Sequence, residues 1–216
     1  MFSSDRREML RRSSLYVLLN LRGSRGEFVA LGQSLIDAGV HIIQLRDKHA
    51  SDADLLTHAR LLREITRGTN TLCIINDRPD LALRADADGV HLGQDDASVS
   101  DARRILGRER IIGVSTHRLS DVRRAARDGA DYIGCGPTFP SATKQFDCFA
   151  GLDFLRGAQR EAGCPAFAIG GIDADNLSQV METGFRRIAV GAAVVDAANP
   201  AARARELLDL LGNPVR

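Results

Sequence analysis

The segment DAGVHIIQLR, residues 37–46, joins the end of a predicted helix to a predicted buried strand, and variants of it recur along the chain. DADGVHLGQ (residues 86–94), DGADYIGCG (residues 128–136) and ETGFRRIAVG (residues 182–191) repeat the order of a turn followed by an apolar run. Glycine suits such a turn because it tolerates the left-handed conformation at a helix end. These junctions predict βαβ units and a parallel sheet.

The number of such units indicates the fold. Eight apolar runs are predicted as strands, at residues 15–19, 41–45, 71–75, 89–92, 110–114, 131–135, 166–170 and 187–191. Apolar residues at three- and four-residue steps predict helices at 28–39, 53–66, 78–86, 99–107, 119–129, 174–184 and 200–212. The chain is therefore predicted to be an α/β protein, a single (β/α)8 TIM barrel over residues 15–216, with an open doubly wound sheet as the alternative. The polar residues 1–14 form an N-terminal extension that could be a short helix.

The overall charge excludes some classes of partner. The 29 Lys and Arg residues balance 28 Asp and Glu residues, so the formal net charge is +1. This balance gives no broad field for nucleic acid or a membrane surface, and any anion must be bound locally. The sequence has no secretory pattern and no apolar run of membrane-spanning length. Its four cysteines lack metal or redox spacing, so we expect a cytoplasmic protein with reduced thiols.

Polar or glycine-rich segments follow the second to the eighth predicted strands. In a TIM barrel the carboxyl ends of the strands meet at one rim, which carries the active site. We therefore expect these residues to lie around one mouth. They are Gln44, Arg46, Lys48, Asn76, Asp77, Asp96, Ser115, His117, Ser141, Thr143, Lys144, Gly171 and Gly191.

The cations after the second strand have two interpretations. Arg46 and Lys48 could bind phosphate, and arginine can do so with two parallel hydrogen bonds. They could instead form a surface ion pair with Asp47.

The carboxylates after the third and fourth strands are candidate metal ligands. Asp77 and Asp96 could hold Mg²⁺, whose other positions would go to water and phosphate oxygens. Each could instead cap the helix that follows it, and Asp95 competes for the metal role.

Two anion sites of different strength are expected at this rim. The charged group with its metal suits a pyrophosphate, whereas the IGGI and AVGAAV segments, with Ser141 and Thr143, offer mainly backbone N–H groups and suit a single phosphate. One substrate of each kind suggests a substitution in which pyrophosphate leaves. His117 could act as an acid or base, or only as a hydrogen-bonding residue beside Ser115.

The motifs QLRDK, INDRPDLAL, ADGVHLGQDD, GVSTH, GADYIGCGPTFPSATK and AIGGI together resemble the thiamine phosphate synthase family, from Leu15 nearly to the C-terminus. The resemblance implies a Mg²⁺-assisted barrel enzyme, a transferase that is often a homodimer. Such an enzyme joins 4-amino-2-methyl-5-hydroxymethylpyrimidine pyrophosphate to a thiazole phosphate and releases thiamine monophosphate and pyrophosphate. The family's reaction is dissociative: pyrophosphate departs first, and the thiazole nitrogen captures the resulting methylene cation.

The same resemblance implies roles for individual residues. The metal ligands would be Asp77 and Asp96. The pyrimidine pyrophosphate would contact Gln44, Arg46, Lys48, Asn76, Ser115 and Lys144. The thiazole phosphate would contact Ser141, Ala142, Thr143, Gly171, Val190 and Gly191. Gly191 departs from the family pattern, because many members have serine there.

Two alternative functions share this barrel. A thiazole tautomerase uses a histidine after the fifth strand for proton transfer, which His117 could supply. A non-catalytic phosphate-binding regulator is expected to lose its metal ligands. Retention of the charged set favours the synthase over both: Arg46, Lys48, Asp77, Asp96 and Lys144.

Overall fold

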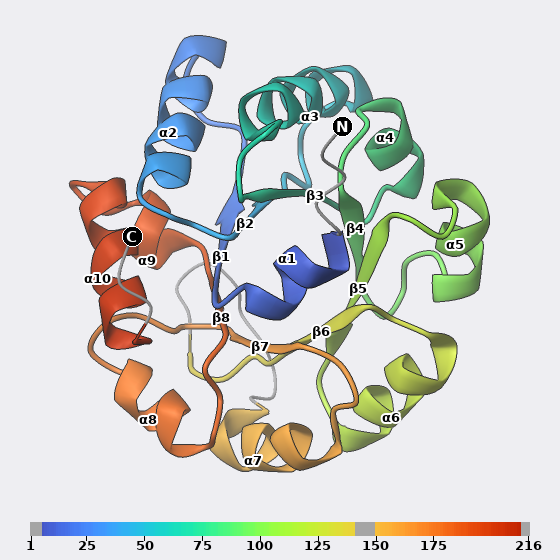
Figure 1. Ribbon diagram of the computed structural model, residues 1–216, viewed down its shortest axis with the longest axis vertical. Helices are drawn as coiled ribbons and strands as arrows, with labels where there is room; N and C mark the ends of the chain where they lie inside the picture. Colours follow the sequence, from blue (N-terminus) through green and yellow to red (C-terminus); the bar gives the residue numbers. More distant parts are fainter. Residues whose placement is uncertain (1–5, 141–149, 213–216) are drawn as a thin grey trace.

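The computed structural model describes residues 6–140 and 150–212 of the chain. Eight parallel strands close into a barrel in sequence order, β1 to β8, which confirms the predicted (β/α)8 fold (Figure 1). The strands are β1 (Leu15–Leu19), β2 (Ile42–Leu45), β3 (Leu72–Asn76), β4 (Gly89–Leu92), β5 (Ile111–Thr116), β6 (Tyr132–Cys135), β7 (Ala166–Ile169) and β8 (Ile188–Val190).

Helices surround the barrel, apart from α1, which crosses one end of it (Figure 1). They are α1 (Arg6–Arg12), α2 (Arg25–Asp37), α3 (Asp52–Thr66), α4 (Pro79–Arg84), α5 (Val99–Leu106), α6 (Leu119–Asp128), α7 (Gly151–Glu161), α8 (Leu177–Glu182), α9 (Ala192–Val195) and α10 (Pro200–Leu210). Serine side chains cap α2, α3 and α5, as their sequences favour. The helices predicted from the sequence do not include α7 or α9. None of the described helices is long and apolar enough to cross a membrane.

Alternation along the strands divides the apolar residues into two groups. One group packs between the strands and the surrounding helices, and the other fills the barrel interior. The interior group comprises Leu10, Tyr16, Ile42, Leu72, Ile74, Ile111, Tyr132, Phe167 and Ala189. Gln44, Asn76 and Ser115 share the strand alternation of this group, because each lies an even number of residues from an interior neighbour on its own strand. The fold therefore assigns these predicted site residues to the barrel interior.

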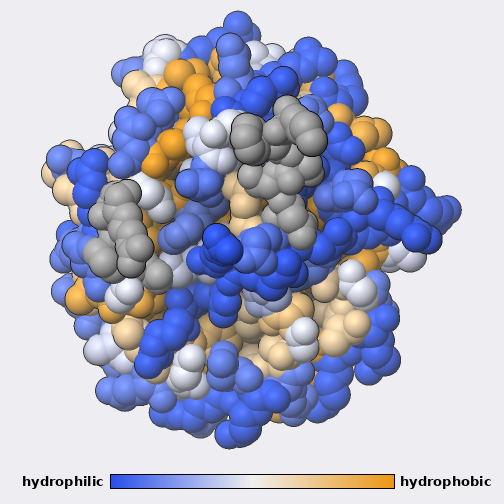
Figure 2. All heavy atoms as spheres, in the orientation of Figure 1, coloured by the Kyte–Doolittle hydropathy of each residue, from blue (hydrophilic) through white to orange (hydrophobic). Residues whose placement is uncertain are grey.

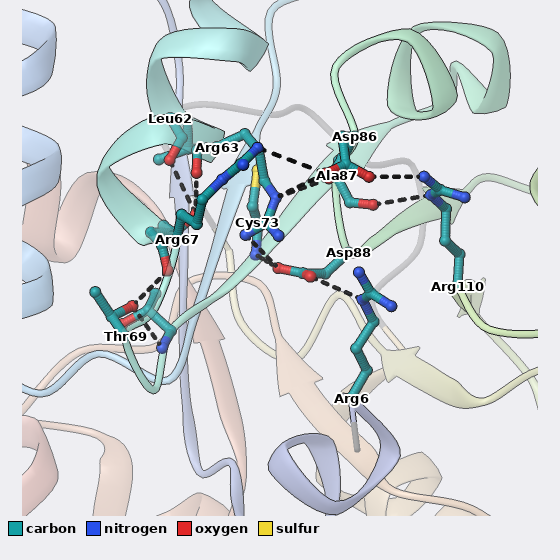
Figure 3. Close-up of polar contacts among 12 residues, drawn as sticks. Arg6, Leu62, Arg63, Arg67, Thr69, Cys73, Asp86, Ala87, Asp88 and Arg110 are labelled. Atoms are coloured by element: carbon teal, nitrogen blue, oxygen red, sulfur yellow. Dashed lines mark hydrogen bonds and ion pairs between the residues drawn. The ribbon is translucent and has the colours of Figure 1, made fainter. Parts of the chain in front are cut away.

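Helix α1 closes the amino ends of the strands, opposite the rim. Leu10 of α1 is buried against the interior residues. Arg6 Nε lies 2.8 Å from Asp88 Oδ1, and Arg7 Nε lies 2.8 Å from Asp131 Oδ1. Asp88 also accepts a hydrogen bond from the Cys73 N–H, so the charged network is joined to the barrel backbone (Figure 3). The face of the molecule that carries α1 is largely hydrophilic (Figure 2).

Candidate active site at the carboxyl ends of the strands

Asp77 follows β3 in an unusual backbone conformation. Its φ angle is 60°, in the left-handed region that residues other than glycine seldom adopt. Its N–H donates to the carbonyl oxygen of His91 on β4 at 2.8 Å. Strained residues of this kind are concentrated at functional sites, where surrounding contacts hold them in place.

The carboxyl groups of Asp77 and Asp96 are hydrogen-bonded neighbours. Burial raises the pKa of Asp77 to about 6, and the hydrogen bond and charge of Asp96 act in the same direction. Asp96 Oδ2 also accepts the N–H of Gly93 at 2.7 Å. Burial and the neighbouring Asp96 charge both disfavour ionised Asp77, and a hard cation between the two carboxyl groups would offset both effects.

Two cations stand beside this carboxylate pair. Lys48 Nζ lies 3.9 Å from Asp77 Oδ2, and the charges of Lys48 and Arg46 both lower the pKa of Asp77 against the effects that raise it. The predicted alternative, a pair with Asp47, is not the arrangement found for Lys48. Asp47 instead accepts the N–H groups of His49 and Ala50 and shapes the turn after β2.

Neither carboxylate caps a helix. The N-cap residue of α4 is Arg78, without a side-chain cap, and that of α5 is Ser98, whose hydroxyl accepts from the Asp101 N–H. The alternative role predicted for Asp77 and Asp96 is therefore wrong. Their proximity to each other needs another explanation, and a shared ligand supplies one.

A pocket of about 300 Å³ opens beside Asp77 at the ends of β2 and β3. Arg78, in its wall, is held by ion pairs to Asp52 and Asp80. The lining residues are Leu45, Asp47, Lys48, Ala50, Asp52, Leu55, Asn76, Asp77 and Arg78. The structure thus brings Lys48, Asn76 and Asp77 together at one cavity.

A series of hydrogen bonds crosses the barrel interior from Gln44 to Ser115. Gln44 Nε2 donates to Tyr16 Oη. Tyr16 Oη lies 3.0 Å from Tyr132 Oη, which lies 3.0 Å from His91 Nδ1. His91 Nε2 lies 3.0 Å from Ser115 Oγ. Two predicted substrate contacts on strands that are not neighbours, β2 and β5, are therefore physically connected.

Glycines at the ends of β7 and β8 provide the second part of the rim. Gly171 has φ 65°, and a Cβ there would lie 2.5 Å from the Pro140 carbonyl oxygen. The Gly171 carbonyl accepts from Asn176 Nδ2 at 2.8 Å. Val190 is buried at the end of β8, and Gly191 is the N-cap residue of α9. Neighbouring strand ends of this kind carry phosphate sites in many barrels.

His117 lies just after β5, close to Ser115 in sequence. Its Nδ1 donates to the Gly136 carbonyl oxygen at 2.6 Å, because a carbonyl can only accept. In the neutral ring, Nε2 is then the hydrogen-bond acceptor. This arrangement fixes the ring orientation, and a catalytic role for His117 stays a prediction.

The family model for thiamine monophosphate synthase matches residues 15–194, a range that includes all eight strands of the barrel. The chain belongs to the thiamine monophosphate synthase family.

Individual proteins with related names are similar to this chain over most of its length. The thiamine-phosphate synthase of Chloroflexus aurantiacus is 45% identical over 200 residues, which cover 91% of this chain and 92% of that protein. The thiamine-phosphate synthase of Synechococcus sp. (strain WH7803) is 46% identical over 179 residues, which cover 83% of this chain and only about half (51%) of that longer protein. The solved thiamine phosphate pyrophosphorylase from Pyrococcus furiosus superposes with a TM-score of 0.83 at 33% identity, covering 95% of this chain and 97% of that one.

Part of the site predicted from the thiamine monophosphate synthase resemblance lies outside the described residues. These are Ser141, Ala142, Thr143 and Lys144. Within residues 6–140 and 150–212, no cluster of three His, Cys, Asp or Glu side chains could hold a metal ion. The pair Asp77 and Asp96 would therefore need other oxygens, such as those of phosphate and water, to complete a coordination shell.

Sequence reasoning missed three residues of the interior series. The strand patterns give His91 a structural role and place Tyr16 and Tyr132 in the strand core, with no hint of their hydrogen bonds. One small indication that polar side chains cross the interior was present in the sequence: Gly113 and Gly134 interrupt the apolar runs of β5 and β6. A Cβ at Gly113 would lie 2.0 Å from the Tyr132 ring, so that glycine leaves room for the phenol.

Proposed function

We propose that this protein is a thiamine phosphate synthase. It couples 4-amino-2-methyl-5-hydroxymethylpyrimidine pyrophosphate with a thiazole phosphate to give thiamine monophosphate and pyrophosphate. The observation that carries this proposal is the carboxylate pair Asp77 and Asp96 with Lys48 and Arg46 beside it. The names of relatives that align over most of this chain support it.

The donor set fits Mg²⁺. Asp77 and Asp96 would hold the cation through carboxylate oxygens, and a divalent ion would offset the burial and the neighbouring Asp96 charge that raise the pKa of Asp77. When bound, the ion would supply positive charge for the oxygens of the leaving pyrophosphate.

Binding and charge stabilisation account for the reaction without a protein nucleophile. Arg46, Lys48 and Asn76, with Lys144, bind the pyrophosphate, and their charges stabilise it most as its bond to the methylene carbon breaks. Gln44 and Ser115 hold the pyrimidine.

The second substrate binds across the ends of β6 to β8. Its phosphate is held by Gly171, Val190 and Gly191 with the segment Ser141–Thr143. This placement orients the thiazole nitrogen toward the carbon that loses pyrophosphate, so that the capture step is intramolecular in effect.

The direct test uses purified protein with both substrates and Mg²⁺, and detects thiamine monophosphate by mass spectrometry. Product should require both substrates and disappear with a chelator. Conversion of a thiazole phosphate tautomer without the pyrimidine would instead support the tautomerase. Binding of a phosphate without any turnover would support the regulator.

A further inference from the structure

The interior hydrogen-bond series runs without a break from Gln44 to Ser115. We propose that it links the Gln44 amide and the Ser115 hydroxyl into one unit that selects an aminopyrimidine over an oxopyrimidine. This inference rests on the proposed function, in which both residues contact the pyrimidine. It assigns a positioning role to Tyr16, Tyr132 and His91.

Each internal member of the series can both donate and accept. Burial raises the pKa of the Tyr16 and Tyr132 hydroxyls, so both keep their protons. Neutral imidazole has one N–H and one acceptor nitrogen, and His91 uses Nδ1 toward Tyr132 and Nε2 toward Ser115. A donor at one side of His91 therefore requires an acceptor at its other side.

This constraint leaves two directions for the whole series. When every group donates toward Ser115, the Gln44 nitrogen begins the series and His91 Nε2–H ends it on Ser115 Oγ. Gln44 then keeps its carbonyl oxygen as an acceptor, and Ser115 keeps its O–H as a donor. When the direction is reversed and the Gln44 amide is turned over, Gln44 presents N–H and Ser115 presents an acceptor.

The first direction complements an aminopyrimidine. An exocyclic amino group donates, and the adjacent ring nitrogen accepts. An oxopyrimidine presents the opposite pair, a carbonyl oxygen and a ring N–H, and needs the reversed series. A mixed state leaves a buried donor or acceptor unsatisfied, which is costly in a low-dielectric interior.

An independent observation favours the first direction. Gln44 Oε1 is buried and has no hydrogen-bond partner within the described part of the chain, whereas Gln44 Nε2 donates to Tyr16 Oη. Buried polar atoms normally have partners, so this oxygen indicates a missing donor. An amino group of a ligand is a donor of the required kind.

Packing holds the series in register. The Tyr16 and Tyr132 rings each pack edge-on against Phe167, with centroids 5.6 and 5.7 Å apart. A Cβ at Gly134 would lie 3.3 Å from His91 Cε1, so the imidazole lies closely against β6. Replacing either tyrosine by phenylalanine would keep the ring packing and remove only the linking hydroxyl.

The test compares the 4-aminopyrimidine pyrophosphate with its 4-oxo counterpart in kcat/KM, with Mg²⁺ and a thiazole phosphate. The unmodified protein should prefer the amino compound by about 10³-fold or more, as expected for a site with buried hydrogen-bonding groups. Tyr132→Phe and Tyr16→Phe each break the connection between Gln44 and Ser115. Each should lower the ratio of the two kcat/KM values about tenfold, the discrimination expected from one hydrogen bond. Ile74→Val, an interior change without a polar group, should leave the ratio unchanged.

The ratio of the two kcat/KM values distinguishes a positioning role from a general loss of packing, because a poorly packed barrel would lower kcat/KM for both substrates equally. A folded Tyr132→Phe protein with the ratio of the unmodified protein overturns the inference, and Tyr16→Phe gives the same decision if Tyr132→Phe does not fold. Product formation with an unchanged ratio rejects this inference alone. If neither pyrimidine yields product, or binds in a calorimetric titration, the proposed function fails with it.

Discussion

Lys48 Nζ lies 3.9 Å from Asp77 Oδ2, so a cation from the end of β2 faces a carboxylate from the end of β3. Asp77 has a second neighbour in Asp96, whose hydrogen bond and charge raise its pKa. The site thus offers both carboxylates and a cation to a ligand, and a metal pyrophosphate carries the complementary charges: a cation for the carboxylates and an anion for the lysine. Perturbed carboxyl groups in a cleft are typical of functional sites.

Asp77→Asn should lower kcat/KM about 10²-fold or more, the scale found when one stabilising group is removed from a developing charge. Asparagine is preferred to alanine because Asp77 has φ 60°, a conformation that asparagine tolerates. The measurement is the coupling rate as a function of Mg²⁺ concentration. Asp95→Asn, at an exposed neighbouring position, is the control, and an equal loss there would remove the special role of Asp77.

The pKa of Asp77, raised from 3.8 to about 6, predicts the pH dependence of metal binding. Protons compete for the site below pH 6, so apparent Mg²⁺ affinity should fall as pH falls from 7 to 5. In the presence of a chelator, the raised pKa means that the protonated carboxyl stabilises the fold. That contribution is complete below pH 3.8 and is lost as pH rises through about 6. Calorimetric titrations measure the Mg²⁺ affinity at each pH, and denaturant unfolding with a chelator measures the stability. Asp77→Asn should reduce the pH dependence of both quantities.

Arg46→Ala should reduce kcat/KM about 10²-fold with little change in unfolding temperature, because Arg46 follows β2 at the rim and, under the proposed function, its charge would stabilise the leaving group. Arg156→Ala is the matched control: Arg156 is paired with Asp153 on the same helix, α7, and both side chains are exposed. Steady-state kinetics and thermal unfolding of both variants give the comparison. Normal turnover in Arg46→Ala would exclude this residue from the mechanism.

Gly191→Ser should lower the KM for the thiazole phosphate about tenfold, since it adds a hydroxyl that can donate to a charged oxygen. The position has room for a side chain: φ is −118°, outside the left-handed region, and a Cβ there would lie 3.9 Å from its nearest neighbour, Leu18. Gly171→Ser is the contrasting variant, because its Cβ would lie 2.5 Å from the Pro140 carbonyl oxygen. We expect Gly171→Ser to weaken binding, and a gain in both variants would contradict the assignment.

Asp88→Asn should destabilise the protein by about 2 kcal/mol or more without changing kcat/KM, because removing its charge leaves a partly buried arginine without its carboxylate. Asp88 is buried at the amino ends of the strands, where it pairs with Arg6 and accepts from the Cys73 N–H (Figure 3). Denaturant unfolding measures the loss. A large kinetic defect at temperatures where the variant is folded would show that this end influences the rim.

The sequence allowed the barrel to be predicted, and with it the meeting of Lys48, Asn76 and Asp77 at one cavity, because strand ends in a TIM barrel converge by topology. Asp77 and Lys48 could thus be brought together from the order of the strands alone. The left-handed backbone at Asp77 could not be foreseen, since it depends on a hydrogen bond to His91 on the next strand.

The interior series was invisible for a different reason. Tyr16 and Tyr132 are 116 residues apart, and in sequence each has the pattern of a core aromatic residue. Only the closed barrel makes their hydroxyls neighbours. Helix α9 was missed because its four residues are too few to show a helical period.

Leu10 closes the barrel at the end away from the rim and belongs to the same buried cluster as the interior residues Tyr16 and Ile42. Under the proposed function, substrates would enter at the opposite end, the rim formed by the carboxyl ends of the strands. Occupation of that rim by both substrates would shield a short-lived carbocation from hydrolysis. Leu10 at one end and the bound substrates at the other would together exclude water from the barrel interior during the reaction.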